Sequence, residues 1–298
     1  MTFVKPRRSM LYMPGNSPGM LQHAPVFGAD SVLLDLEDAV AVAEKDAARR
    51  LVADFLRVLD FGRVEVTVRI NGADTPYFET DLEEIVPARP SAVRLPKCQS
   101  PGDVLRADSL MTAIEERHGM VVGTVGIHAM LETAKGLEHA FEIATASPRV
   151  KALTLGGQDL TADLGVQKTR EGWELFYARG RVVMAARAAG IAAFDTVWTD
   201  VDDPEGLAAE AKQIVEMGFT GKAAIHPSQI PVIHEAFRPD FREFRRAWRI
   251  VTAAEEAERQ GKGVLLVDGR MVDGPIVLRA RRLLDLGVLY GMKGDETA

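Results

Sequence analysis

The chain has 298 residues, of which 47% are apolar and 27% charged, and its formal net charge at pH 7 is -7. This is the composition of a globular protein with enough chain for one large domain or two smaller ones, and it argues against a basic nucleic-acid-binding surface. No apolar run reaches the roughly 18 residues needed to span a bilayer. A single cysteine, Cys98, excludes an internal disulfide, and the start of the chain lacks the apolar core of an export signal, so we expect a cytoplasmic protein.

Eight short segments are predicted to be strands, because each is an apolar run bounded by polar or turn-forming residues. In chain order they are Ser9–Met13, Ser31–Leu36, Val64–Ile70, Ala92–Leu95, Val121–Leu131, Val150–Leu155, Ala192–Trp198 and Lys222–Ile225. Most are continuously apolar, which is typical of parallel strands buried on both faces. Apolar residues at helical spacing between them, as from Ala48 to Leu59, predict intervening helices.

The alternation of eight strands with helices predicts an α/β fold, specifically a (β/α)8 TIM barrel. A doubly wound open sheet is the alternative, but no Gly-x-Gly-x-x-Gly follows the first strand. After Ile225 the pattern changes to a helical stretch over Pro227–Gln260, a hairpin or loop over Gly261–Pro275, and a helix over Val277–Leu289. We therefore expect a barrel catalytic domain over residues 1–237 and a C-terminal helical extension over residues 238–298, acting as a lid or an oligomerisation segment.

Polar side chains gather where the predicted strands end, which is where TIM barrels carry out their chemistry. These strand ends hold Asp35, Glu37, Asp38, Arg69, Asn71, Lys97, Glu132, Gly157, Gln158, Asp159, Asp195 and His226. Burying such charges without compensation is costly, so a divalent cation and an anionic substrate are expected to neutralise them together. Oxygen ligands without a cysteine cluster or a histidine pair favour Mg²⁺, with Mn²⁺ as a possible substitute, and Glu132 and Asp159 fit as its ligands.

Each of these residues also has an ordinary structural explanation. Asp159 can be a helix N-cap, and Glu132 can be a first-turn acid favoured by the helix dipole. Arg69 can close a salt bridge, His226 can be a structural hydrogen-bonding group, and Cys98 can be incidental. The individual residues therefore leave these alternatives open.

Eight motifs carry a family resemblance that the single residues do not. They are Arg8–Asn16, Leu34–Val40, Arg69–Asn71, Arg94–Lys97, Glu132–Ala134, Gly156–Leu160, Gly221–Gln229 and Met271–Pro275. Together they resemble the citrate lyase β-subunit family, which belongs with the HpcH/HpaI aldolases and includes malyl-CoA and citramalyl-CoA lyases. The resemblance extends from about Arg8 to Leu284.

The resemblance implies a Mg²⁺-dependent barrel that cleaves or forms a carbon–carbon bond beside a thioester carbonyl. The implied substrates are an acyl-CoA and a small 2-oxo acid. Glu132 and Asp159 would hold the metal, and Glu37 and Asp38 would hydrogen-bond its water ligands. Arg69 would contact the substrate and the developing enolate oxygen.

The same resemblance assigns the remaining site residues. Backbone N–H groups near Gly157 and Gln158 would bind the oxo-acid carboxylate at a helix start, Asn71 would contact substrate, and Lys97 would lie near the CoA tail or the mouth of the barrel. Asp273 would be the acid/base group. In related lyases its segment comes from a neighbouring protomer, so a homotrimer or homohexamer is expected.

Four activities are compatible with these motifs. The favoured one is a lyase acting on a malyl-, citramalyl- or similar acyl-CoA. A citrate lyase β subunit acting on an acyl-carrier-protein thioester is the second, and a thioesterase or pyruvate-type aldolase on the same barrel is the third. A non-catalytic homologue is the fourth, and the presence of Glu132, Asp159, Arg69 and Asp273 argues against it.

Overall fold

The computed structural model describes residues 6–260 and 265–293 and divides the chain into two compact units. The barrel unit comprises Arg7–Ala236, and the C-terminal unit begins at Phe237.

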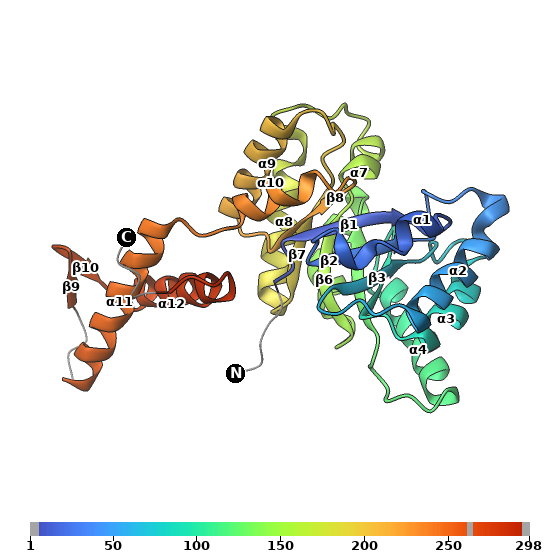
Figure 1. The fold of residues 1–298 in the computed structure, drawn as a ribbon, viewed down its shortest axis with the longest axis horizontal. Helices are drawn as coiled ribbons and strands as arrows, with labels where there is room; N and C mark the ends of the chain where they lie inside the picture. The colour runs from blue at the N-terminus through green and yellow to red at the C-terminus, as the bar shows by residue number, and fades with distance from the viewer. Residues whose placement is uncertain (1–5, 261–264, 294–298) are drawn as a thin grey trace. The chain divides into compact units, whose positions relative to one another are not determined.

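The barrel unit is a closed ring of eight parallel strands, which confirms the predicted (β/α)8 barrel (Figure 1). Each strand pairs with the next along the chain, and the eighth pairs with the first. The strands are β1 (Ser9–Pro14), β2 (Ser31–Asp35), β3 (Glu65–Arg69), β4 (Ala92–Leu95), β5 (Gly126–Leu131), β6 (Val150–Leu155), β7 (Ala192–Asp195) and β8 (Gly221–Ala224).

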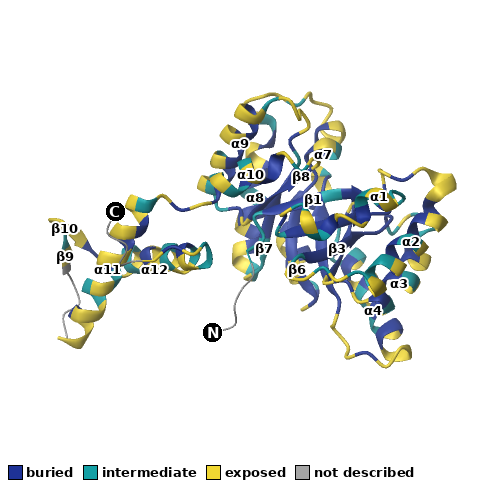
Figure 2. Cartoon of the chain, in the orientation of Figure 1, coloured by how far each residue is buried: buried dark blue, intermediate teal, exposed yellow. Residues whose placement is uncertain are grey.

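Helices surround the strands and expose their outer faces to solvent, whereas the strands are buried (Figure 2). The α-helices of this unit are α1 (Pro18–Leu21), α2 (Lys45–Val58), α3 (Phe78–Ile85), α4 (Pro101–Arg117), α5 (Ala134–Glu138), α6 (Ala140–Thr145), α7 (Gly157–Asp163), α8 (Trp173–Ala189), α9 (Pro204–Met217) and α10 (Gln229–Ala236). Short 3₁₀ turns cover Ala24–Val26, Val42–Glu44 and Val86–Ala88.

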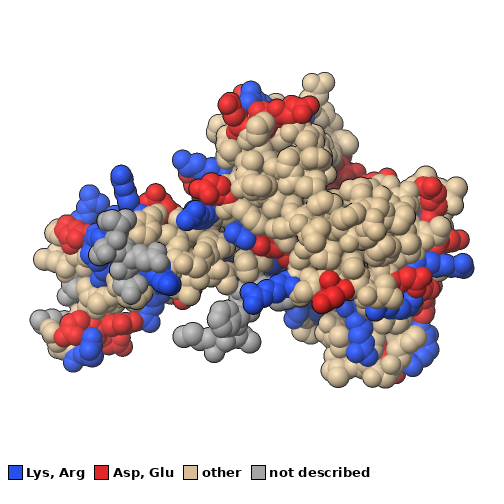
Figure 3. Space-filling view, viewed as in Figure 1, with Lys and Arg blue, Asp and Glu red and all other residues tan. Residues whose placement is uncertain are grey.

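Helix α4 shows how the local sequence sets these elements. It begins with a capping box in which Ser100 and Asp103 satisfy each other's backbone N–H groups, and Pro101 occupies its first turn. Its buried residues Val104, Ala107, Met111 and Ile114 recur at intervals of three and four, so one face packs against the barrel. On the face drawn in Figure 3, acidic and basic side chains lie near one another at the margins of the barrel unit.

The strand register decides which side chains point into the barrel. Asp35 pairs with Arg69, Arg69 with Arg94, and Arg94 with His128, and paired residues on neighbouring strands point to the same face. These four polar side chains therefore lie on the inner face. Beside His128 and Arg94, Met10, Ala152 and Phe194 form a fully buried apolar cluster inside the barrel.

Several predicted boundaries were wrong by three or more residues: strand β7 ends at Asp195 rather than Trp198, and the last helix begins at Gly274 rather than Val277. Strand β5 begins at Gly126 rather than Val121, because Thr124 closes a turn onto Val121 and Gly123 has a φ of 87°. Val121 is 81% exposed, so its apolar side chain does not belong to the core.

The predicted helix over Pro227–Gln260 is also two helices rather than one. They are α10 and α11 (Phe241–Arg259), and the break between them contains Pro239, which disfavours helical backbone at the residue before it. The Asp240 side chain then caps α11 by accepting from the N–H groups of Arg242 and Glu243.

The C-terminal unit contains α11, a two-stranded antiparallel hairpin of β9 (Leu265–Val267) and β10 (Arg270–Val272), and α12 (Gly274–Leu289). Ala247, Ile250, Val272 and Ala280 form its small core. Residues 261–264 of the predicted hairpin or loop lie outside the described residues. Among the described helices of both units, none combines the length and apolarity needed to cross a membrane.

Candidate active site

Arg69, at the end of β3, is held in one orientation by Asp35 on the neighbouring strand. Arg69 Nε donates to Asp35 Oδ1 at 2.7 Å and Nη2 donates to Oδ2 at 2.6 Å, a two-point ion pair between side chains that are only 8% and 2% exposed. Burial opposes ionisation of Arg69, but Asp35 outweighs it and raises the arginine pKa well above its usual value. The guanidinium is therefore a fixed, permanent positive charge at the mouth.

The third nitrogen of Arg69 faces the acidic loop after β2. Arg69 Nη1 lies 2.8 Å from Glu37 Oε2 and 3.5 Å from Asp38 Oδ2, and Lys97 Nζ lies 3.3 Å from Glu37 Oε1. Glu37 is buried, whereas the side chain of Asp38 is 59% exposed. Burial raises the pKa of Glu37 despite the opposing effect of Arg69.

Glu132, directly after β5, is a buried carboxylate that lacks a full set of partners. Its Oε1 accepts a hydrogen bond of 2.6 Å from the backbone N–H of Lys97, while Oε2 is buried and has no hydrogen-bond partner among the described residues. Burial, followed by the nearby charges of Asp159 and Glu37, raises the pKa of Glu132 to about 8. Glu132 therefore lies near two further acids, Glu37 and the predicted metal ligand Asp159.

The backbone around Glu132 is specialised for this arrangement. Lys97 has a φ of 51°, in the left-handed region that a residue with a side chain adopts only at a cost, and in this conformation its N–H meets Glu132. Gly156, at the end of β6, leaves no space for a β-carbon, which would collide with Glu132 Oε2. Both features hold the carboxylate in place.

These residues fit a hard divalent cation. The unpartnered Glu132 oxygen, the neighbouring Asp159 and the mutual repulsion of the carboxylates are what a metal would relieve. Within the described ranges, no cluster of three or more His, Cys, Asp or Glu residues could hold a metal ion. Two carboxylates completed by water and substrate are the usual donor set for Mg²⁺.

Two of the predicted substrate-binding residues, Asn71 and Gly157, already form hydrogen bonds with other groups of the protein. The Asn71 amide nitrogen donates to Asp81 Oδ2 at 2.6 Å and to the Leu36 carbonyl at 3.0 Å, so it connects α3 with the loop after β2. The Gly157 N–H donates to Thr196 Oγ1 at 3.0 Å, and Gln158 is exposed. The backbone donor expected at Gly157 is thus already engaged by a side chain.

Asp273 belongs to the C-terminal unit. Its side chain is the N-cap of α12, where Oδ1 accepts from the Ile276 N–H at 3.2 Å, and the residue is exposed. The capping hydrogen bond neither requires nor excludes an acid/base role, so the catalytic role of Asp273 stays a prediction.

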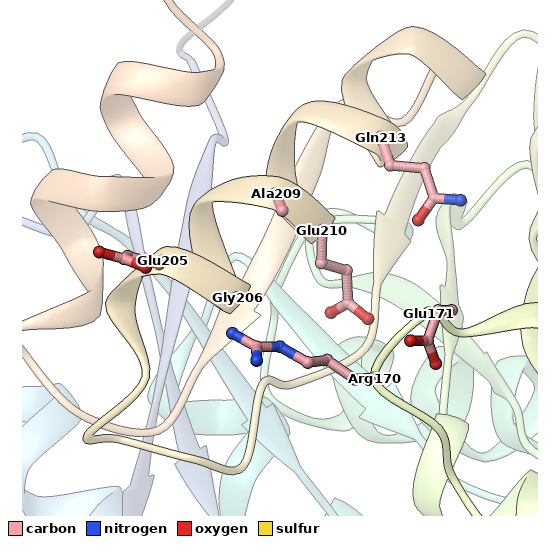
Figure 4. Close-up of a pocket in the computed structure, with 7 residues that line it drawn as sticks. All are labelled: Arg170, Glu171, Glu205, Gly206, Ala209, Glu210 and Gln213. Atoms are coloured by element: carbon pink, nitrogen blue, oxygen red, sulfur yellow. The ribbon is translucent and has the colours of Figure 1, made fainter.

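A second charged cluster lies on the outside of the barrel. Asp195, at the end of β7, pairs with Arg179 and with Lys222, and both bases also pair with Glu210, all four side chains being at most 4% exposed. Glu210 lines a pocket of about 370 Å³ beside α9, together with Arg170, Glu171 and Glu205 (Figure 4). Its charges are mutually satisfied, so we regard the cluster as structural.

A protein-family model described as HpcH/HpaI aldolase/citrate lyase matches residues 8–227, which is most of the chain. The chain belongs to this family. The family predicted from the sequence motifs is therefore confirmed, and as an HpcH/HpaI family member the protein is a carbon–carbon lyase.

Individual relatives match this HpcH/HpaI family member along nearly its whole length. Citrate lyase subunit beta of Leuconostoc mesenteroides subsp. cremoris is 44% identical over 280 residues, covering 94% of this chain and 93% of the relative. A (3S)-malyl-CoA thioesterase of Cereibacter sphaeroides is 38% identical, covering 94% of each. The solved structure of CitE from Mycobacterium tuberculosis in complex with magnesium, acetoacetate and coenzyme A has a TM-score of 0.77 and 33% identity, covering 95% of this chain and 98% of that one.

Sequence reasoning missed three contributors to the mouth. Asp35 was noted as a strand-end acid but not as the partner that fixes Arg69, although the register of β2 and β3 dictates that pairing. Thr196 and Asp81, which engage Gly157 and Asn71, lie outside the quoted motifs. Only the spatial arrangement of the strands reveals them.

Proposed function

We propose that this HpcH/HpaI family member is a Mg²⁺-dependent lyase that cleaves, or forms by Claisen-type condensation, a 3-hydroxyacyl-CoA thioester such as malyl-CoA or citramalyl-CoA. The products of cleavage are an acyl-CoA and a 2-oxo acid. The observation that carries the proposal is the pairing of an acid-rich, incompletely partnered carboxylate site at Glu132 with the immobilised guanidinium of Arg69. The carboxylate site would attract a cation, and the guanidinium would bind an anionic oxygen.

The residues divide the chemistry between them. Glu132 and Asp159 would hold Mg²⁺, which supplies Lewis-acid polarisation of the oxo-acid oxygens. Arg69 keeps N–H groups beyond its Asp35 contacts and would bind the thioester oxygen, which becomes negative as the carbon–carbon bond breaks and its electron pair moves towards the carbonyl. In our proposal Asp273 moves the proton between the substrate hydroxyl or the enolate carbon and solvent.

Glu37, Asp38 and Lys97 would organise the entrance. Glu37 bridges Arg69 and Lys97, so it can orient both cations while facing the metal's water shell. The exposed ammonium of Lys97, whose side chain is 45% exposed, is available to a phosphate or carboxylate of the thioester carrier. Asn71 and the first turn of α7, at Gly157 and Gln158, would complete the oxo-acid side of the site.

A second candidate is cleavage of citryl-acyl-carrier protein. The 44% identity to a citrate lyase β subunit, against 38% to the malyl-CoA thioesterase, favours it, while the coenzyme A bound in the solved CitE relative favours a CoA thioester. Both candidates use the same metal and enolate chemistry and differ in the thioester carrier.

One panel separates these candidates. Malyl-CoA, citramalyl-CoA, citryl-CoA and citryl-acyl-carrier protein are incubated with the protein and Mg²⁺, and glyoxylate, pyruvate, oxaloacetate and free thiol are measured separately. We expect a 2-oxo acid in amounts equal to the acyl thioester, with loss of turnover in chelator and in Glu132→Gln but not in the exposed control Glu138→Gln. Release of free thiol without any 2-oxo acid would make the protein a thioesterase and contradict the proposal.

A further inference from the structure

Arg94 is a buried cation without an anionic partner. It lies on β4 with no exposed surface and forms no ion pair with any residue in the described part of the chain. Its Nη1 donates to the Tyr12 hydroxyl at 2.9 Å and its Nη2 donates to Met10 Sδ at 3.1 Å, and within residues 6–260 and 265–293 its Nε has no hydrogen-bond partner. A guanidinium whose hydrogen-bond partners are neutral, and whose neighbour on the next strand is the cation Arg69, is costly to bury, so its charge calls for an explanation beyond packing.

Tyr12 connects this buried charge with the mouth of the barrel. It lies on β1, two residues after the inward-facing Met10, so its side chain also points into the barrel. The neighbouring residues Leu11 and Met13 are fully buried, yet Tyr12 is partly exposed. An inward-facing side chain that solvent still reaches must line the mouth.

The Tyr12 ring also contacts the candidate active site directly. The Arg69 Cζ atom lies 5.4 Å from the ring centroid and the Arg94 Cζ atom 5.7 Å from it, so both guanidiniums lie over the same ring. Tyr12 and Arg69 therefore border the same part of the barrel mouth.

The hydrogen bond from Arg94 determines what the Tyr12 hydroxyl can do. Because the phenol oxygen accepts a charged N–H, its own proton points elsewhere, and no residue that the structure describes accepts that proton. A donor polarised by a neighbouring cation forms stronger hydrogen bonds, most of all to an anionic oxygen.

We propose that Tyr12 is a catalytic residue that donates a hydrogen bond to the acyl oxygen of the substrate, beside Arg69, and that Arg94 is a positioning residue acting through Tyr12. The inference rests on the proposed function for the identity of that oxygen. Tyr12 and Arg69 form a pair of donors around the charge that develops there. The buried charge of Arg94 thereby finds its counter-charge only when the ligand is bound.

The test begins with Tyr12→Phe, which removes one oxygen and keeps the ring that both guanidiniums contact. We expect kcat/KM for the preferred thioester to fall about 100-fold or more, within the range for loss of one donor to a developing charge. The matched control is Tyr177→Phe, because Tyr177 is 66% exposed on α8 and outside the site. Unchanged kcat/KM in Tyr12→Phe would overturn the inference and leave the proposed lyase activity standing.

A binding measurement makes the test independent of turnover. Acetoacetate is titrated calorimetrically, with Mg²⁺ present, into the wild-type protein, Tyr12→Phe, Arg94→Gln and the double variant. We expect each single substitution to weaken acetoacetate binding about fivefold or more, and the double variant to be no weaker than Tyr12→Phe, since both substitutions remove the same donor.

Each outcome has a defined meaning. Additive losses in the double variant would show that Arg94 acts separately and would overturn its positioning role. If Arg94→Gln does not fold, the affinity of Tyr12→Phe alone decides, and an affinity equal to wild type overturns the inference. If the wild-type protein binds acetoacetate but cleaves no thioester, the proposed function fails while these titrations still decide the role of Tyr12.

Discussion

Replacing Glu132 with glutamine should stabilise the metal-free protein while abolishing its response to Mg²⁺. The substitution keeps the size of the side chain, and the amide oxygen can still accept from the Lys97 N–H. It removes a buried carboxyl group that lies close to Asp159 and Glu37. A residue that destabilises the fold unless its ligand is present is expected at a functional site rather than at a structural one.

The size of the effect follows from the pKa of about 8, against an ordinary value of 4.5. Because the folded protein holds the proton more tightly than the unfolded chain, stability falls as the pH rises from about 4.5 to about 8 and then levels off. At pH 7 the penalty is at most about 3 kcal/mol, taking about 1.4 kcal/mol per pKa unit. The glutamine amide leaves a buried group partly unpaired, so we expect a net gain of about 1 to 3 kcal/mol.

Urea unfolding at several pH values between about 5 and 9, with chelator and then with Mg²⁺, measures both halves of the prediction. In chelator the stability advantage of Glu132→Gln should grow with pH. With Mg²⁺ at 100 times its Kd the wild-type protein should gain about 2.7 kcal/mol and the variant nearly nothing. A variant that is less stable than wild type in chelator, or that Mg²⁺ stabilises equally, would refute the reasoning.

Glu210→Gln is the matched control, because it makes the same chemical change at a buried carboxylate that is fully paired. Glu210 lies 2.7 Å from Arg179 and 2.6 Å from Lys222. Burial raises its pKa, but the two cations outweigh burial and hold the pKa below its usual value. This variant should lose about 3 to 5 kcal/mol of stability, the opposite sign, because it leaves two buried cations with Asp195 as their single shared carboxylate among the described residues.

Three further predictions concern the other charged residues. Arg69→Lys should lower kcat about 100-fold or more, because lysine cannot keep the two-point contact with Asp35 while also facing the substrate. Steady-state kinetics that show only a raised KM would instead assign Arg69 to ground-state binding. If Asp273 completes the site of a neighbouring subunit, mixing inactive Asp273→Asn with inactive Glu132→Gln should restore part of the activity once mass spectrometry shows subunit exchange, and full exchange without recovery contradicts the trans arrangement. Burial raises the pKa of Asp195, but Lys222 and Arg179 outweigh burial and lower that pKa below its usual value. The ionised carboxylate therefore stabilises the fold at pH values above its unfolded pKa of about 3.9. This stabilisation is lost as the pH falls through the pKa of the folded protein. Asp195→Asn should accordingly flatten the acid side of the stability–pH curve, and an unchanged slope would count against this assignment.

The barrel could be predicted from the sequence because its strands are short, continuously apolar runs, and a parallel strand buried on both faces produces that pattern. The exact ends of the strands were harder to predict from the sequence. Val121 and Val122 extend an apolar run that the chain ends with a turn at Gly123, and the exposed side chains show that apolar character alone does not define a strand.

The candidate site was predictable to the extent that strand ends identify it. What a strand end does not reveal is the face on which a side chain lies. Asp195 ends β7 as Glu132 follows β5, but the preceding Phe194 points into the barrel, so Asp195 points outward to Arg179 and Lys222. Tyr12 was overlooked because an aromatic residue within an apolar run is ordinarily part of the core, whereas here its side chain lines the barrel mouth.

Lys97 acts on the mouth through two different parts of its structure. Its ammonium pairs with Glu37, while its backbone N–H, presented by a left-handed backbone conformation, holds Glu132. Alanine scanning would remove the first contribution and retain the second, and would add strain at a positive φ. Asparagine and glycine, which adopt this conformation more readily, are the informative replacements, because they delete the charge while keeping the main-chain donor in place.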